Sequence, residues 1–167
     1  MKDFNITRFV GKWYEIERSF YLMELTSSCT TLDISMNHKD DTKLDVETNL
    51  VNRITGEPSS PSKGVAIQSK KDPTILKYQI QSTRLPTTIA RLMPGAGTYQ
   101  ILHTDYNNYA ILWTCSNLKI AHSDLVWILG RTREINANKR AEIYSVLAGF
   151  NIDSDRLVLS KNKDCPT

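Results

Sequence analysis

The sequence contains no long apolar run and no strong excess of one charge. No segment approaches the roughly 20 apolar residues needed to span a bilayer. The 21 lysines and arginines, against 18 aspartates and glutamates, are spread along the chain, so the net charge of +3 does not indicate nucleic-acid binding. With 167 residues, 40% of them hydrophobic, and no repeat or linker, residues 1–167 are predicted to form one soluble globular domain.

Cysteine is scarce, and its three positions are Cys29, Cys115 and Cys165. No two are close enough in sequence for a zinc knuckle or a redox dithiol. A bridge between Cys29 and Cys165 would fasten the tail to the body and stabilise the fold by about 4–5 kcal/mol in the chain-entropy model. Three buried free thiols are the alternative. Residues 1–4 lack the apolar core of a signal peptide, so the protein is either cytosolic or has lost such a peptide.

Motifs of catalytic and metal-binding sites are missing. The three histidines, His38, His103 and His122, lie far apart, and there is no His-Glu-x-x-His, Gly-x-Ser-x-Gly or glycine-rich phosphate loop. His103 and His122 are the candidates to bind a haem iron, but nothing in the pattern positions them for it. The sequence therefore predicts a protein that is not an enzyme, holds no metal and requires no cofactor.

Short stretches of alternating apolar and polar residues recur along the chain. Residues 30–37, 43–50 and 76–81 place apolar side chains at every second position, which is typical of antiparallel strands with one apolar face. Residues 105–108 connect two further stretches as a hairpin turn would. The pattern favours an all-β fold, either a sandwich or an up-and-down barrel, and strand spacing does not separate the two.

Two segments depart from the strand pattern. From Ile143 onward, apolar residues recur at helical spacing, which predicts a helix over 136–150 with Gly149 in the left-handed conformation at its end. A short strand is expected at 156–160. Segment 83–97 is long for a loop in a compact domain, and such loops are usually lids or mobile.

Three short motifs resemble the signatures of the lipocalin family. The matching residues are Gly11 and Trp13 in the first, Thr104, Asp105 and Tyr106 in the second, and Arg131 in the third. Their order, followed by a helix and a strand, covers nearly the whole chain. The resemblance implies an all-β fold, an eight-stranded antiparallel up-and-down β-barrel with one C-terminal α-helix packed outside and a short ninth strand.

In such a barrel the motif residues would be structural and would not touch a ligand. Trp13 would plug the closed end, and the Arg131 guanidinium over its indole would contribute about 1–2 kcal/mol of cation–π attraction. Gly11 would let the chain pass where a side chain would collide. Glu15 and Glu17 share the parity of Trp13, so each needs a basic partner or a bend in the strand. We expect Glu17 to be solvated.

Within the family, the sequence resembles the apolipoprotein D group with the insect bilin-binding and Lazarillo-type lipocalins, most clearly at residues 11–17 and 163–166. The cysteine pattern of that group implies a disulfide between Cys29 and Cys165. It also implies that Cys115 pairs with an N-terminal Cys-Pro arm, which this sequence lacks, so Cys115 is expected to be unpaired unless it pairs between chains. The resemblance further implies a secreted, extracellular protein.

The apolar parity of each strand selects the side chains that would line the barrel. The predicted ligand-binding residues are Ile34, Met36, Val46, Ile67, Tyr78, Ile80, Tyr99, Ile101, Leu112, Leu125 and Trp127. The same parity places Leu32, Leu44, Val65, Leu76, Ala110 and Leu129 inward. The inward aromatic rings suit an elongated or conjugated ligand. The alternative is that these rings fill the barrel and leave no cavity.

The sequence thus predicts an extracellular carrier for a small hydrophobic ligand such as a bilin, a fatty acid, a retinoid or a similar lipid. Bound biliverdin or a bound lipid would occupy the barrel. The alternative is a protein-binding or inhibitory lipocalin that acts through its mouth loops. Segment 83–97 is expected at the mouth, as a contact to a membrane or lipoprotein surface or as an ordinary loop. The sequence identifies neither the ligand nor the oligomeric state.

Overall fold

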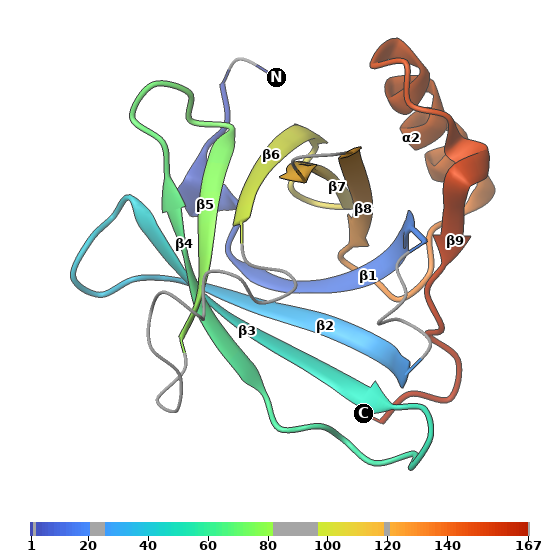
Figure 1. Ribbon diagram of the computed structural model, residues 1–167. Coiled ribbons are helices and arrows are strands. Elements are labelled where there is room, and N and C mark those ends of the chain that lie inside the picture. Colours follow the sequence, from blue (N-terminus) through green and yellow to red (C-terminus); the bar gives the residue numbers. More distant parts are fainter. Residues whose placement is uncertain (2, 21–25, 82–96, 119–120, 167) are drawn as a thin grey trace.

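The computed structural model describes the chain except residues 2, 21–25, 82–96, 119–120 and 167. In this part of the chain, eight antiparallel strands form a closed barrel (Figure 1). They are β1 (Gly11–Ser19), β2 (Ser27–Met36), β3 (Lys43–Asn52), β4 (Ser62–Gln68), β5 (Ile75–Gln81), β6 (Gly97–Thr104), β7 (Tyr109–Leu118) and β8 (Ala121–Gly130). Each strand pairs with the next, and β1 pairs with both β8 and β2, which closes the ring. The predicted up-and-down barrel is confirmed, and the sandwich is excluded.

One helix, α2 (Ala137–Gly149), packs against the outside of the barrel (Figure 1). Asn136 caps its start by accepting a hydrogen bond at 2.8 Å from the backbone three residues further on. Ile143 is 1% exposed and faces the sheet. The predicted helix is confirmed. Its end differs from the prediction, because Asn151 (φ 57°), and not Gly149, adopts the left-handed conformation.

Three short elements complete the described fold. They are the 3₁₀ turns η1 (Ile6–Arg8) and η3 (Ser154–Arg156) and the strand β9 (Leu157–Leu159). β9 pairs antiparallel with β1 outside the ring, as the pattern at 156–160 predicted. Among the described helices, none has the length and apolar character needed to cross a membrane.

The sheet separates two apolar clusters. Buried residues of the inner cluster are Phe4, Ile6, Phe9, Trp13, Ile34, Leu44, Val46, Ala66, Leu76, Ile101, Tyr106, Ala110 and Leu129. Buried residues of the outer cluster, between the sheet and α2, are Ile16, Leu102, Tyr109, Ile111, Val126, Ile128, Ile143 and Leu147. The inner cluster belongs to the barrel interior, where a ligand would bind.

Half-way along strand β1, the alternation of inward and outward side chains is shifted by one residue. It pairs with β2 only over residues 11–14, and its register on β8 shifts between Glu15 and Glu17. The bulge turns Glu17 toward α2, where it is 3% exposed. There its carboxylate forms an ion pair with Arg140, at 2.8 Å from Nε, and accepts a hydrogen bond from the Tyr144 hydroxyl at 2.7 Å. The expectation that Glu17 is solvated is therefore wrong, since the bulge places it under the helix.

Beyond β9, the chain crosses from β1 to β2 where these two strands no longer pair. We call this segment, residues 160–166, the C-terminal strap. The backbone N–H of Cys29 in β2 donates to the carbonyl of Lys161 at 2.9 Å, and a disulfide joins Cys29 to Cys165. The predicted disulfide is confirmed. Cys115 is exposed and forms no disulfide with a described cysteine.

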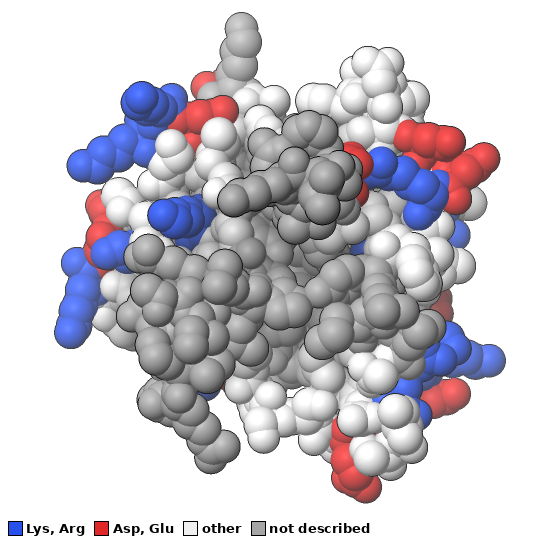
Figure 2. All heavy atoms as spheres, viewed as in Figure 1, with Lys and Arg blue, Asp and Glu red and all other residues white. Residues whose placement is uncertain are grey.

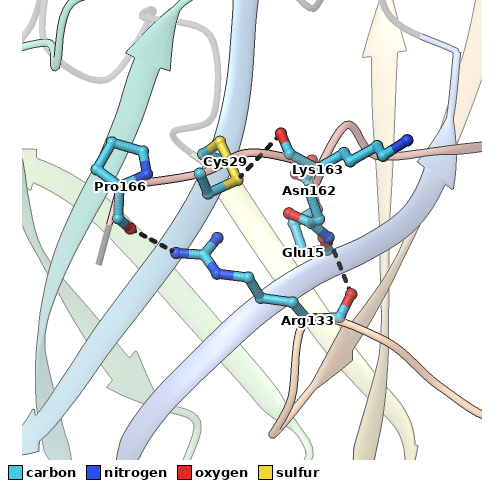
Figure 3. The surroundings of a disulfide bond; sticks show 7 residues. Glu15, Cys29, Arg133, Asn162, Lys163 and Pro166 are labelled. Atoms are coloured by element: carbon cyan, nitrogen blue, oxygen red, sulfur yellow. Dashed lines mark hydrogen bonds between the residues drawn. A yellow bond between two sulfur atoms is a disulfide. The ribbon is translucent and has the colours of Figure 1, made fainter.

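Further hydrogen bonds hold the strap against the barrel (Figure 3). The Ser160 hydroxyl donates to the Glu15 carboxylate at 2.8 Å, and the Asn162 amide donates to the Glu15 carbonyl at 2.7 Å. Near the chain end, Arg133 donates to the carbonyl of Pro166 at 3.3 Å. The strap therefore takes the place of strand pairing between the end of β1 and the start of β2.

Candidate ligand-binding site

Aromatic side chains plug one end of the barrel beneath an arginine. Trp13 is fully buried, lies 5.1 Å from the Phe9 ring, and donates its indole N–H to the Phe9 carbonyl at 2.9 Å. The guanidinium carbon of Arg131 stands 3.6 Å from the centre of the Trp13 ring. Gly11 has φ +103°, and a Cβ atom there would meet Arg131 at 3.0 Å. A glycine is thus needed at this position both for its backbone angle and for space.

The Arg131 guanidinium also joins the start of β1 to the hairpin between β6 and β7. It donates to the carbonyls of Val10, Lys12 and Tyr106, each at 2.9 Å. Burial lowers the pKa of Arg131, but a guanidinium keeps its charge at any physiological pH. This end of the barrel is therefore closed by packing and by charge-assisted hydrogen bonds.

The hairpin itself is built from the second motif. Thr104 donates its hydroxyl to the Tyr109 carbonyl at 2.6 Å and accepts from the Tyr106 N–H at 2.9 Å. Asp105 accepts backbone hydrogen bonds from Asn108 at 2.8 Å and Tyr109 at 3.0 Å. Tyr106 adopts a left-handed backbone (φ 66°) with its ring buried in the inner cluster. The motif residues thus hold the closed end and lie away from the mouth.

Strand register decides which predicted lining residues face the interior. Directly opposed residues of antiparallel strands point to the same face, so the pairs Ile34–Val46 and Leu112–Trp127 each share a side. The predicted residues that the register places inward are Ile34, Met36, Val46, Tyr78, Ile80, Tyr99, Ile101, Leu112, Leu125 and Trp127.

Strand β4 has the opposite phase from the prediction. Ala66 lies opposite Tyr78 and belongs to the inner cluster, whereas Ile67 lies opposite lysines on both neighbouring strands. The prediction that Val65 and Ile67 face inward is therefore wrong. The interior accepts only small residues here because the Tyr78 ring fills the space, and a Cβ atom on Gly64 would lie 2.4 Å from that ring.

Three inward aromatic rings form a row across the barrel. The Tyr78 and Tyr99 rings are 6.4 Å apart at nearly a right angle, and the Tyr99 and Trp127 rings are 5.5 Å apart. Burial raises the pKa of the Tyr78 hydroxyl, and a hydrogen bond with Thr48 partly opposes this shift. Thr48 has the same parity as Val46, but it is polar, so a pattern of apolar residues does not reveal that it faces inward. The row offers flat surfaces and hydroxyl groups to a ligand.

Burial decreases along the interior from the plugged end toward the opposite end, which we call the mouth. Interior residues near the plug, such as Leu44, Ala110 and Leu129, are at most 2% exposed. In contrast, Tyr78 and Trp127 keep part of their surface accessible although they face inward. These inward side chains are therefore not fully enclosed by their neighbours in this half of the barrel. The predicted mouth segment, apart from Gly97, lies outside the described residues.

An ion pair lies on the inner side of β1 beyond the aromatic row. Glu15 and Arg18 contact each other, and their side chains are 7% and 10% exposed. Arg18 lies opposite Trp127 in the register. Since a lone buried carboxylate would be unstable, the arginine and the Ser160 hydroxyl together account for the burial of Glu15. In the sequence, the parity that Glu15 shares with Trp13 indicated that this carboxylate points inward and needs a partner.

The titratable groups beneath α2 lie outside the barrel. His103 Nδ1 is 2.9 Å from the Tyr109 hydroxyl, which donates to Glu142 at 3.2 Å. Burial and the Glu142 carboxylate raise the pKa of Tyr109. His103 therefore does not offer a nitrogen to the barrel interior. No group of three or more His, Cys, Asp or Glu side chains that could hold a metal ion is found in the described ranges.

Comparison with known proteins agrees with this architecture. The chain is 28% identical to apolipoprotein D of Cavia porcellus over 170 residues, which cover 99% of this chain and 80% of that protein. It is 28% identical to the Lazarillo protein of Schistocerca americana over 163 residues, 93% of this chain and 69% of that protein. The solved structure of insecticyanin from Manduca sexta has the same fold, with a TM-score of 0.77 at 23% identity over 98% of this chain and 84% of that chain. The model of the lipocalin / cytosolic fatty-acid binding protein family matches residues 10–164, so this chain belongs to that family.

Proposed function

We propose that the protein carries a small hydrophobic ligand in the half of the barrel nearest the mouth. The row of Tyr78, Tyr99 and Trp127 supports this proposal, because these rings face inward and keep accessible surface. A protein that acted only through its mouth loops would not need accessible aromatic rings inside the barrel. Membership of the lipocalin family supports the same function.

The expected affinity follows from the area that a ligand buries. Removing roughly 350 Å² of apolar ligand surface from water contributes about 9 kcal/mol. Loss of translational and rotational freedom costs at least about 4 kcal/mol, which leaves at most about 5 kcal/mol. Burial alone therefore gives a Kd of about 0.2 mM or weaker, and tighter binding needs ring contacts and hydrogen bonds.

The interior favours a flat or elongated ligand with one polar group. The three rings provide apolar faces, and the hydroxyls of Tyr78 and Thr48 provide hydrogen bonds. Bilins such as biliverdin, retinoids and fatty acids have this chemistry. The ligand would be cargo, with no cofactor required and no reaction catalysed.

A secreted, extracellular location is part of the proposal. The disulfide between Cys29 and Cys165 closes a loop of the chain with a sequence separation of 136 residues. Structural disulfides persist in oxidising compartments and are rare in the cytosol. The disulfide therefore supports a protein that works outside the cytosol.

Tryptophan fluorescence tests the site directly. The protein is titrated with biliverdin, retinol and palmitate, and Trp127→Phe is compared with Trp113→Phe. Trp113 is the matched control because its indole N–H donates to Asp124 at 3.2 Å and its side chain packs with the outer cluster. We expect the Trp127 variant to lose most of the quenching and the Trp113 variant to retain it. Equal quenching in the two variants, or no binding of any of the three compounds, would refute the proposal.

A further inference from the structure

Figure 1 shows the end of β1 beside β9, with the start of β2 on the same side of the molecule. Residues of these segments line a separate cleft. It has a volume of about 170 Å³ and is lined by Arg18, Phe20, Ser27, Arg53, Val158, Leu159 and Lys161. The strap supplies Lys161, and β9 supplies the two aliphatic residues. The cleft therefore exists only because the C-terminal segment packs beside β1 and β2.

Apolar side chains are unusually exposed around this cleft. Phe20 is 59% exposed, Leu159 64% and Val158 38%. In the described part of the chain six large hydrophobic side chains are exposed, and these three line one cleft. Single exposed apolar residues are common, but a cluster of them on a soluble protein marks a binding surface.

The charges lining the cleft are positive. Arg18 is neutralised by Glu15. Arg53 and Lys161 are exposed, and neither forms an ion pair with an acidic residue of the described ranges. Figure 2 shows that the lysines and arginines of the pictured face stand in several separate groups, most of them with acidic side chains nearby. Two unneutralised cations next to an apolar surface are complementary to a ligand that is itself an anion with an apolar chain.

We propose that this cleft is a second ligand site, which binds an amphipathic anion. The anionic head, a carboxylate or a phosphate, pairs with Arg53 and Lys161, and the first carbons of the alkyl chain pack on Phe20 and Leu159. The volume of about 170 Å³ is below the roughly 300–1,000 Å³ of sites for drug-sized ligands. The site therefore holds the head and a short part of the chain, and the remainder stays in solvent. This site shares no side chain with the aromatic row, although Arg18 at its edge lies opposite Trp127.

The strap gives the cleft a fixed shape. The carbonyl of Lys161 accepts from the Cys29 N–H at 2.9 Å, and the Ser160 N–H donates to the Ile16 carbonyl at 2.8 Å. These bonds, together with the disulfide to Cys165, hold both sides of the cleft to the barrel wall. The cations and the apolar side chains are therefore positioned before a ligand arrives, which lowers the entropic cost of binding.

Amide chemical shifts during a titration with sodium octanoate test the proposal. Binding in the cleft moves the amide signals of Phe20, Ser27 and Leu159, whereas binding in the barrel moves those of Tyr78 and Tyr99. We expect the cleft signals to respond to octanoate and to octyl phosphate. We expect no response of these signals to octan-1-ol, which lacks the charge, or to acetate, which lacks the chain. Raising the ionic strength from about 0.1 M to about 1 M should weaken the cleft response, because the Debye length falls from about 10 Å to about 3 Å.

The decisive variant is the double substitution Arg53→Gln and Lys161→Gln, which should weaken octanoate binding in the cleft by about tenfold or more. Its matched control is Lys70→Gln with Lys71→Gln, which removes the same charge from the exposed turn between β4 and β5 and should leave binding unchanged. Both pairs are on the surface, so neither should impair folding. The proposal is overturned if the two double variants bind octanoate equally, or if octanoate moves only the barrel signals. A barrel response that persists while the cleft response is lost supports two separate sites.

Discussion

Replacing Arg131 by alanine should cause a large loss of stability for a change at a partly exposed residue. The substitution removes the cation at 3.6 Å from the Trp13 ring. It also removes three hydrogen bonds of 2.9 Å to the carbonyls of Val10, Lys12 and Tyr106. These contacts join the start of β1 to the β6–β7 hairpin, so their loss loosens the plug of the barrel.

The magnitude follows from the individual contacts. A cation–π contact of this kind contributes about 1–2 kcal/mol when desolvated, and a hydrogen bond from a charged donor about 1.5–3 kcal/mol. Water can reach part of the Arg131 site, which reduces the cost of the carbonyls left without a donor. We therefore expect Arg131→Ala to lower the free energy of unfolding by about 3 kcal/mol. For a domain of this size, the Tm should fall by about 6–12 °C.

Urea unfolding followed by far-UV circular dichroism measures this loss, with Arg133→Ala as the matched control. Arg133 also lies over an aromatic ring, at 4.8 Å from the centre of Tyr14, and makes an exposed hydrogen bond to Pro166 at 3.3 Å. It should therefore contribute about 1 kcal/mol or less. If Arg131→Ala is no more destabilising than Arg133→Ala, the plug does not depend on the guanidinium and our reasoning is incorrect.

Three further substitutions have defined outcomes. A hydrogen bond from Arg156 lowers the pKa of Asp124, so this carboxylate stabilises the fold above its unfolded-state pKa of about 3.9 and loses that contribution as the pH falls through its folded pKa. Asp124→Asn should therefore reduce stability near neutral pH by less than about 1 kcal/mol, since the two side chains are 35% and 39% exposed, and in urea titrations this difference should shrink as the pH falls below about 4. Cys165→Ser should lower the midpoint of unfolding in guanidinium chloride, since the free energy of unfolding falls by up to about 5 kcal/mol in the chain-entropy model. An unchanged midpoint would count against a structural disulfide. Gly64→Ala should displace the Tyr78 ring and destabilise the fold by about 1–3 kcal/mol, and a thermal melt identical to that of the unchanged protein would contradict the close contact.

The barrel could be predicted because its main determinants are local or short motifs. On β2, the alternation of Leu32, Ile34 and Met36 defines the inner face without reference to any other strand. Arg131, directly after β8, lies over Trp13 at the closed end of the barrel. The residues of β8 with the same parity, Leu125, Trp127 and Leu129, therefore point inward. Patterns of this kind lie within one strand, so they can be read before the partners are known.

Strand β4 could not be predicted from such a pattern. Its central residues 64–67 are apolar or small on both faces, so local hydrophobicity selected the larger Val65 and Ile67. The true phase depends on the Tyr78 ring of the neighbouring strand, which needs the space above Gly64. Small residues beside a large ring are a property of a pair of strands, and a single strand does not reveal it. The inward position of Thr48 could not be predicted for a related reason. Its hydrogen-bond partner is the hydroxyl of Tyr78, which lies on another strand.

The two glutamates of β1 show why the site and the strap must form together. They have the same parity in the sequence, yet the bulge between them sends Glu15 to Arg18 and the strap, and Glu17 to Arg140 under α2. Without the bulge, both carboxylates would face the barrel interior, where a desolvated charge without its partner costs several kcal/mol. The same bulge separates β1 from β2, which opens the gap that the strap fills through the Cys29 N–H. One irregularity in one strand thus removes Glu17 from the interior, leaves only the neutralised Glu15–Arg18 pair on the inner side of β1, and makes the disulfide-linked tail a necessary part of the barrel wall.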